Sequence, residues 1–281
     1  MKKQDYFILL AFFAAIFLVH EGFAQEKNTY VYKTVDEKEL KLDVYLPDVP
    51  DLQVRPVIVF FHGGGFIIGS RSLHKYQCTY FAQRGMVAVS ADYRLLSRGA
   101  DPKTEVPKCI MDAKSAVRWV KQHAEKFNID TNKLFLAGAS AGGFLATAAT
   151  LVQDVNENTD DLRISIDATA LVLFNPAYTP ETRYTPSMPS MVSKESPPAI
   201  LFYGDQDRFK LGGDKFFNSL RQEKISASLW VAPGEDHSFY KLEGWNEATC
   251  NMAYNFLLEN EFVTGHLEND VPRFELKRQE E

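Results

Sequence analysis

Six short apolar runs recur along this chain, and they constrain its fold more than any other feature. Each run is continuous rather than alternating, which is typical of strands covered on both faces of a sheet; the runs are 57–61, 86–91, 134–137, 170–174, 199–203 and 228–231. Helical patterns separate several of them, with apolar residues at intervals of three and four over 110–124, after Pro107 at a suitable first helical position, and again over 245–256. Strands and helices in alternation predict an α/β fold with a mostly parallel central sheet and helices on both faces.

The size and composition of the chain fit one such domain. Of its 281 residues, 45% are hydrophobic and 24% are charged, which excludes a disordered, collagen-like or disulfide-dense chain. Segments 30–33 and 41–46 are expected as outer strands, and no repeat or low-complexity linker interrupts the pattern, so we predict a single domain over 25–281. The formal net charge is −6 and no long basic run is present, so nucleic-acid binding through phosphate contacts is not expected.

The first 24 residues have the layout of a secretory signal peptide. Two lysines precede an uncharged apolar stretch of 13 residues, 7–19, which is short for a membrane span. Gly22 and Ala24 then supply the small residues of a cleavage site. We therefore predict cleavage after Ala24, a secreted or periplasmic protein, and no stable membrane anchor. The alternative is an uncleaved N-terminal anchor.

The three cysteines, Cys78, Cys109 and Cys250, contribute little to the expected chemistry. An odd number allows at most one internal disulfide, and none of them lies in a C-x-x-C pair. We expect small buried side chains.

Two segments depart from the strand and helix pattern. Residues 175–198 carry six prolines and no clear period, so they are a candidate lid or substrate-facing loop. The tail from Glu261 is charged and weakly patterned, and we expect it to be solvated or loosely docked.

Glycines cluster at two places, where the backbone must make unusual turns or close approaches. Seven of the sixteen lie within 63–69 and 138–143. The second cluster contains Gly138-Ala139-Ser140-Ala141-Gly142, between an apolar run and the helical stretch 141–151. This is the context of a G-x-S-x-G nucleophile elbow, a sharp turn that exposes the serine hydroxyl and leaves room only for tiny neighbours. Ser140 is therefore the candidate nucleophile, and a plain glycine-rich turn is the alternative.

The first cluster, His62-Gly63-Gly64-Gly65-Phe66, directly follows an apolar run. A hydroxyl that attacks a carbonyl needs donors aimed at the oxygen that becomes negative, and glycines let main-chain N–H groups approach that oxygen. We predict an oxyanion hole formed by the amides of Gly64, Gly65 and Ala141, with Gly63 as a competing donor. A phosphate-binding loop is the alternative, but the G-K-[ST] signature is absent.

A serine hydroxyl becomes a good nucleophile only when a base accepts its proton. Among the six histidines, His237 is the best candidate, because its loop follows the last apolar run and emerges at the same sheet edge as Ser140. The alternative is a histidine in a surface turn. His62 is expected to brace the glycine loop rather than to transfer protons.

The base needs an acid that orients its ring and stabilises its positive form. The loop after the run 199–203 offers Asp205 and Asp207, and spacing alone does not choose between them. Asp236 is adjacent to His237, but neighbouring side chains diverge, so it is not expected to be the partner. With either candidate the order along the chain is serine, acid, histidine, as in α/β-hydrolases.

Four motifs together resemble the HGGG-type serine esterases of the α/β-hydrolase fold, which are related to hormone-sensitive lipase. The motifs are His62-Gly63-Gly64-Gly65, Asp92-Tyr93-Arg94-Leu95, Gly138-Ala139-Ser140-Ala141-Gly142-Gly143 and Gly204-Asp205-Gln206-Asp207. The similarity runs from about Tyr30 to about Leu258, and the exported form with a short N-terminus resembles the bifunctional acetyl-xylan and feruloyl esterase branch.

This resemblance implies roles for several residues. The family's G-x-x-D pattern selects Asp207 as the acid and leaves Asp205 as a turn residue. Arg94 and Asp112 lie where the family has structural polar residues. No metal or organic cofactor is implied.

The expected function is that of an exported serine carboxylic ester hydrolase working through an acyl-enzyme. Lipase-like members usually carry helical cap segments at the N-terminus, whereas here only 175–198 is available as a lid. An open site would suit short acyl groups, of acetyl or feruloyl type, on small molecules or plant polysaccharide rather than long-chain lipids. The alternatives are a general carboxylesterase, an arylformamidase-like amide hydrolase, an exopeptidase, and a hydrolase-fold binding protein without activity.

Overall fold

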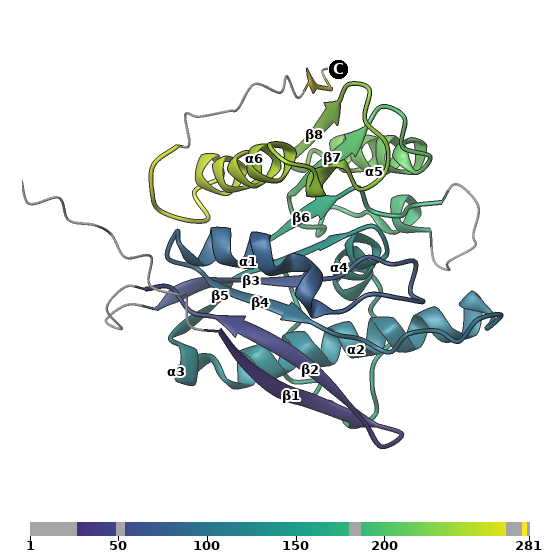
Figure 1. The fold of residues 1–281 in the computed structure, drawn as a ribbon, viewed down its shortest axis with the longest axis vertical. Helices are drawn as coiled ribbons and strands as arrows, with labels where there is room; N and C mark the ends of the chain where they lie inside the picture. Colours follow the sequence, from purple (N-terminus) through teal and green to yellow (C-terminus); the bar gives the residue numbers. More distant parts are fainter. Residues whose placement is uncertain (1–26, 49–53, 180–186, 268–276, 280–281) are drawn as a thin grey trace, which may run out of the picture.

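A single nine-stranded sheet forms the centre of the molecule in this computed structural model, which describes residues 27–48, 54–179, 187–267 and 277–279. The predicted signal peptide, its cleavage site and part of the candidate lid lie outside the described residues. The strand order is β1-β2-β4-β3-β5-β6-β7-β8-β9 (Figure 1). The strands are β1 Lys27–Val35, β2 Lys38–Tyr45, β3 Arg55–Phe61, β4 Val87–Ala91, β5 Ile129–Ala139, β6 Ala170–Phe174, β7 Ala199–Gly204, β8 Ala227–Ala232 and β9 Lys277–Arg278.

The six apolar runs of the sequence are the six parallel strands, β4, β3, β5, β6, β7 and β8. The outer hairpin β1–β2 joins this parallel sheet antiparallel to β4, and β9 pairs antiparallel with β8 at the opposite end. The predicted α/β fold with a mostly parallel sheet is therefore confirmed. Because parallel strands end at one edge, the loops that follow β3, β5, β7 and β8 emerge together.

Helices cover both faces of the sheet (Figure 1). On β3, Val57, Val59 and Phe61 point into one core and Ile58 and Phe60 into the other, as the pleat requires. The first core is closed by α2 Pro102–Gln122, α4 Ala141–Leu151 and α5 Lys210–Gln222, and the second by α1 Lys75–Ala82 and α6 Trp245–Glu259. The remaining helical segments are α3 Ala124–Phe127 and the short 3-10 turns η1 Arg71–His74, η2 Met188–Met191 and η3 Phe239–Lys241.

The start predicted for helix α2 was wrong. The helix begins at Pro102 rather than after Pro107, which lies inside it. Asp101 caps the true start, with its side chain accepting a hydrogen bond of 3.0 Å from the main-chain N–H of Lys103. Pro102 has the fixed φ that suits a first helical position, whereas Pro107 is tolerated further in because tertiary packing holds the helix.

A buried ion network ties the hairpin to α2. The Asp112 carboxylate is fully buried and accepts hydrogen bonds from Lys33 Nζ and Arg94 Nε, both at 2.7 Å. Its second oxygen also accepts from the main-chain N–H of Arg94 at 2.9 Å. Glu157 contacts both cations, and the hydrogen bond from Lys33 is the main cause that lowers the pKa of Glu157. Arg94 and Asp112 therefore have the structural environment that the resemblance implied.

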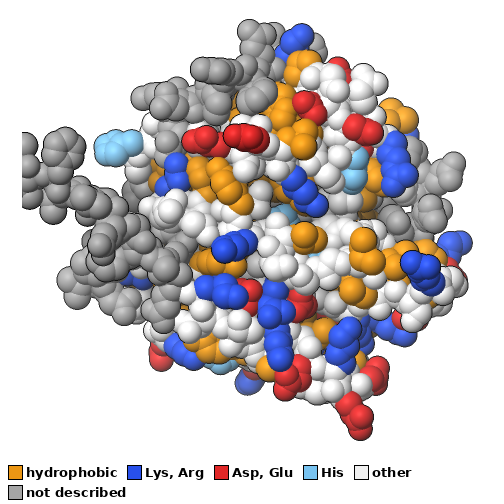
Figure 2. Space-filling model, viewed as in Figure 1, with side chains coloured by type: hydrophobic (Ala, Val, Ile, Leu, Met, Phe, Trp, Pro, Cys, Tyr) orange, Lys and Arg blue, Asp and Glu red, His pale blue; other side chains and the backbone are white. Residues whose placement is uncertain are grey.

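The surface and the cysteines add little chemistry. Lys and Arg side chains are interspersed with Asp, Glu and apolar side chains on the face seen in Figure 2. Within the described ranges, no helix has the length and apolarity needed to cross a bilayer. Cys78, Cys109 and Cys250 are buried free thiols, as expected.

Candidate active site

Ser140 occupies a strained turn between β5 and α4. Its φ of 53° and ψ of −119° lie in a region that side chains other than glycine rarely adopt. The turn is held by the Ser140 N–H, which donates to the Phe174 carbonyl at 3.0 Å. Glycine is required beside it, since a Cβ on Gly142 would lie 1.8 Å from the Phe61 carbonyl oxygen. The sequence signal for a nucleophile elbow thus corresponds to a real backbone constraint.

A chain of hydrogen bonds links Ser140 to His237 and Asp207. Nδ1 of His237 lies 2.8 Å from Oδ2 of Asp207, and Nε2 lies 2.8 Å from the Ser140 hydroxyl oxygen. An ionised carboxylate can only accept, so Nδ1 carries the proton and Nε2 is free to accept the serine proton. The Asp207 side chain is fully buried, and its other oxygen accepts from the Phe209 N–H at 2.8 Å.

The two other aspartates of these loops hold main chain instead. Asp205 accepts a hydrogen bond from the Gly234 N–H at 2.9 Å, and Asp236 accepts one from the main-chain N–H of His237 at 2.6 Å. Both therefore brace the histidine loop. Of the acids that spacing left open, Asp207 is the one hydrogen-bonded to the imidazole ring.

The glycine loop lies beside the serine. Gly63, Gly64, Gly65 and Ala141 all line the pocket that contains Ser140. Among the described residues, the main-chain N–H groups of Gly64, Gly65 and Ala141 have no acceptor, so they are available to an oxyanion, and the same holds for the competing donor Gly63. Gly64 has a φ of 119°, and a Cβ there would lie 1.9 Å from the Ile68 carbonyl oxygen. The loop can take this shape only with glycine at that position.

His62 supports the glycine loop through its ring contacts. Its ring stacks on Tyr93 with 4.3 Å between the centroids, and Nδ1 donates to the Gly63 carbonyl at 2.8 Å. The Tyr93 hydroxyl in turn donates to the His62 carbonyl at 2.8 Å. Burial lowers the pKa of His62, so the ring stays neutral while it braces the loop.

The pocket in front of Ser140 is small. Its volume is about 260 Å³, and its wall includes Phe66, Ala177, Arg208, Phe209 and Lys241. Ala177 belongs to the candidate lid 175–198, so the described part of that loop does face the site.

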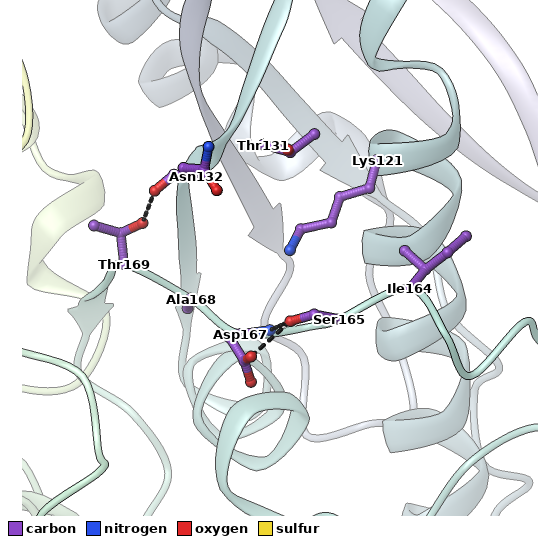
Figure 3. A pocket seen from close by; sticks show the side chains of 8 residues that line it. All are labelled: Lys121, Thr131, Asn132, Ile164, Ser165, Asp167, Ala168 and Thr169. Atoms are coloured by element: carbon purple, nitrogen blue, oxygen red, sulfur yellow. Dashed lines mark hydrogen bonds between the residues drawn. The ribbon is translucent and has the colours of Figure 1, made fainter.

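A larger hollow of about 540 Å³ lies at the opposite, amino-terminal edge of β5 and β6. Figure 3 shows Lys121 directed into it, with Ser165 donating to Asp167 and Thr169 donating to the Asn132 carbonyl. The hydroxyls of Ser165 and Thr169 are thus paired locally, and none of the residues that line the hollow is a histidine or cysteine. It therefore lacks the nucleophile and base found at Ser140.

Sequence reasoning missed Asn175. This residue follows β6 directly, is fully buried, and has a φ of 38°. Its side-chain nitrogen lies 3.1 Å from Nδ1 and 3.2 Å from Nε2 of His237. Because these two distances are nearly equal, the amide lies over the face of the imidazole ring. Within the described structure its Oδ1 is buried without a hydrogen-bond partner. The signal that could have found it is its position, since it is the first residue after a parallel strand at the same edge as Ser140.

No group of three or more metal-ligating side chains is present in the described residues. Burial lowers the pKa of Lys241 and raises that of Tyr240, both in the pocket wall, and it lowers the pKa of His62, which supports the glycine loop.

Comparison with known proteins gives consistent results. The BD-FAE family matches residues 42–174. Esterase LipI of Mycobacterium tuberculosis is 31% identical over 155 residues, which are 55% of this chain and 43% of LipI. The chain thus spans less than half of that relative. Ethyl acetate hydrolase of Pseudomonas putida is 27% identical over 241 residues, with 74% of each chain covered.

Solved structures extend the similarity over nearly the whole described fold. Native esterase 2 of Thermogutta terrifontis superposes with a TM-score of 0.76 and 34% identity, covering 86% of this chain and 95% of that one. Its propionate-bound form has a TM-score of 0.75 at the same identity, covering 85% of this chain and 96% of that one. Its fold, its motifs and these similarities together show that the chain belongs to the α/β-hydrolase-fold serine esterases, in the branch related to hormone-sensitive lipase.

Proposed function

We propose that this protein hydrolyses short-chain carboxylic esters through an acyl-enzyme. The observation that carries the proposal is the hydrogen-bond chain from Ser140 through His237 to Asp207, which opens on a pocket lined by unpaired amides. A nucleophile, its base, an orienting acid and oxyanion donors in one place are the requirements for acyl transfer.

In the first half of the reaction, Ser140 Oγ attacks the ester carbonyl carbon while Nε2 of His237 takes its proton. The amides of Gly64, Gly65 and Ala141 donate to the oxygen as it becomes negative. Asp207 holds the ring in the tautomer with a proton on Nδ1 and stabilises the imidazolium. The tetrahedral intermediate then expels the alcohol, which leaves with the proton from Nε2.

Water completes the cycle by the same route. His237 takes a proton from water as its oxygen attacks the acyl carbon, and the Ser140–acyl bond then breaks as Nε2 returns that proton to Oγ. The products are the carboxylic acid and the regenerated serine. Throughout, His237 changes charge next to a buried carboxylate that accepts two hydrogen bonds. Because this carboxylate is already held in place, the surrounding polar groups need to reorient little in each step.

We infer a small acyl group, of acetyl to butyryl size, from the pocket. A volume of about 260 Å³ lies below the range of about 300–1,000 Å³ that encloses drug-sized ligands. The name of the Pseudomonas relative, ethyl acetate hydrolase, and the propionate- and butyrate-bound forms of the Thermogutta esterase support the same size class. Acetyl esters of plant polysaccharide are the finer proposal, supported by the match to BD-FAE. Feruloyl esters, which that match also supports, carry an acyl group larger than butyryl and require it to extend beyond this pocket.

We also propose that the protein works outside the cytoplasm, as a secreted or periplasmic enzyme. The support is the sequence of residues 1–24, with its lysines, apolar stretch and small residues before Gln25. Mass spectrometry of the N-terminus of protein recovered from the host would test this proposal, with Gln25 as the expected first residue.

The test of function compares the chain 25–281 with its Ser140→Ala variant. We expect release of 4-nitrophenolate from the acetate and butyrate esters to exceed that from the decanoate, and to vanish in the variant. Acetylated xylan and methyl ferulate, assayed in parallel, test the finer proposal. Equal rates for the two proteins on every ester would overturn the mechanism, and a preference for decanoate would overturn the small acyl site.

A further inference from the structure

Two basic side chains line the pocket beside the triad. Arg208 is the residue after Asp207, and Lys241 ends the turn that follows His237, so the loops that supply acid and base also supply both cations. Both belong to the wall of the 260 Å³ pocket, together with Ser140 and the glycine loop. Neither has a role in the hydrolytic steps described above.

Within the described structure, no ion pair joins Arg208 or Lys241 to a carboxylate, although acidic residues are abundant on the same loops. Three of those acids accept hydrogen bonds from other groups. Asp205 and Asp236 accept from main-chain N–H groups, and Glu235 accepts from the Trp245 indole at 2.9 Å. Arg208 and Lys241 therefore line the pocket without a carboxylate partner among the described residues.

Aromatic contacts hold the Arg208 guanidinium near the site without using its hydrogen-bond donors. Its Cζ lies 4.7 Å from the centroid of the Phe209 ring, and that ring meets the His237 imidazole edge to face at 5.0 Å. A guanidinium held this way keeps a planar set of donors that matches a carboxylate. Lys241 Nζ lies 5.7 Å from the centroid of the buried Tyr240 ring. Both cations are thus positioned with their N–H groups free.

The reaction adds to the charge imbalance. When His237 becomes an imidazolium, the pocket holds three positive groups against the Asp207 carboxylate and the developing oxyanion. A further negative charge on the substrate would stabilise this state by Coulomb attraction, although solvent screens the charges because Arg208 and Lys241 are exposed.

We propose that Arg208 and Lys241 form a carboxylate-binding subsite, so that the preferred substrates are esters that carry a carboxylate near the scissile bond. This proposal rests on the proposed ester hydrolysis and names its substrate class. The carboxylate can belong to the acyl part, as in a hemiester of a dicarboxylic acid, or to the alcohol, as in an ester of a hydroxy acid.

The experiment measures the preference for anionic over neutral esters, given as the ratio of their kcat/KM values. For the acyl side, kcat/KM for 4-nitrophenyl hemisuccinate is divided by that for 4-nitrophenyl pentanoate. For the alcohol side, 4-acetoxybenzoate is compared with 4-acetoxybenzamide. We expect Arg208→Gln and Lys241→Gln each to lower the anionic-to-neutral ratio by about tenfold on the preferred side, mostly through KM, since hydrogen bonds to charged groups are the strong ones. The arm in which the ratio falls identifies the side that carries the carboxylate.

Lys215→Gln is the matched control, because it removes one exposed positive charge on α5 outside the pocket. Its ratio should equal that of the unmodified protein. Raising the salt concentration should lower the ratio in the unmodified protein and have less effect in the double variant. An unchanged ratio in the Arg208→Gln/Lys241→Gln double variant, with Ser140-dependent turnover retained, would overturn the carboxylate subsite and leave ester hydrolysis standing.

Succinate binding to Ser140→Ala, measured by calorimetry, tests the carboxylate subsite independently of ester hydrolysis. We expect binding that is lost when Arg208 and Lys241 are also replaced. That result, combined with an absence of Ser140-dependent turnover on every ester, would overturn hydrolysis and support the subsite. No succinate binding to Ser140→Ala, together with equal ratios in all variants, would overturn the subsite alone.

Discussion

Nδ1 of His237 lies 2.8 Å from Oδ2 of Asp207, although the two residues are thirty positions apart in the chain and belong to loops that follow different strands. The carboxylate is fully buried, and its remaining oxygen accepts from a main-chain N–H. Asp236 is the immediate neighbour of His237, yet its carboxylate bonds the backbone. The fold rather than proximity in sequence therefore decides which acid orients the base.

The first prediction tests this choice of acid. Asp207→Asn keeps the shape of the side chain but allows the amide to donate, which favours the wrong imidazole tautomer, so kcat/KM should fall by about 10⁴-fold. Asp205→Asn and Asp236→Asn are the matched controls and should each retain activity within about tenfold, since both act on main chain. Steady-state kinetics on 4-nitrophenyl acetate provides the measurement. A larger loss in Asp236→Asn than in Asp207→Asn would contradict the assignment.

The second prediction concerns strain at Ser140. A residue other than glycine held at φ 53° and ψ −119° costs about 1–3 kcal/mol of stability. Ser140→Gly should therefore raise the free energy of unfolding, by about 1 kcal/mol after the greater freedom of glycine in the unfolded chain is subtracted. Urea denaturation followed by circular dichroism measures the change, and Ser140→Ala serves as the control that retains a Cβ. Equal gains in the free energy of unfolding in both variants would mean that the hydroxyl, and not the backbone conformation, destabilises the protein.

The third prediction separates two neighbouring glycines. A Cβ on Gly65 would meet no atom within 4 Å, so Gly65→Ala costs only the left-handed conformation at φ 62°, about 1–2 kcal/mol. A Cβ on Gly64 would lie 1.9 Å from the Ile68 carbonyl oxygen, so Gly64→Ala must also displace the turn. Thermal unfolding should show the larger loss for Gly64→Ala. A Gly65→Ala variant that is equally unstable would show that the loop packs more closely than its geometry indicates.

The parallel strands and the nucleophile elbow could be predicted because their signals are local. Burial on both faces demands continuous apolar runs, and the tight turn at Ser140 demands small neighbours. Segments whose structure depends on distant contacts gave weaker signals. Strand β9 is a charged Lys277–Arg278 pair that forms only because β8 offers a free edge. Helix α5 has two glycines in its first turn, and a Cβ on Gly212 would lie 2.1 Å from the Tyr178 carbonyl oxygen.

Some residues of the site could be predicted from the sequence alone, and others could not. Topology places Ser140 and His237 at one edge from sequence alone, whereas the choice of Asp207 over Asp205 depended on family resemblance, because both lie in one loop at the right edge. The geometry that separates them is a matter of side-chain direction within a single turn. Asn175 was missed because one asparagine after an apolar run carries no motif. Its importance comes from the ring of His237 lying beneath its amide.

The last prediction uses the pH dependence of stability. His74 is fully buried, its Nε2–H donates to the Phe61 carbonyl at 3.1 Å, and the rings of Phe60 and Tyr240 flank it. Burial, followed by the electrostatic effect of protonating a ring close to His62, lowers the pKa of His74 from 6.5 to about 3. In the unfolded chain the same ring takes up a proton near pH 6.5, so the unfolded state binds more protons below that pH. The stability conferred by a neutral His74 is therefore complete above pH 6.5 and is lost as the pH falls towards 3.

Between pH 7.5 and pH 5 this one residue should lower the free energy of unfolding by about 2 kcal/mol, at 1.36 kcal/mol for each pH unit below 6.5. His74→Gln retains a donor for the Phe61 carbonyl but cannot ionise, so its loss over the same interval should be about 2 kcal/mol smaller. Urea denaturation at both pH values makes the comparison, and the remaining slope in the variant includes His62, whose pKa burial also lowers. An identical slope in the two proteins would mean that His74 is protonated inside the fold, and the hydrogen bond to the strand that precedes the glycine loop would then be charge-assisted.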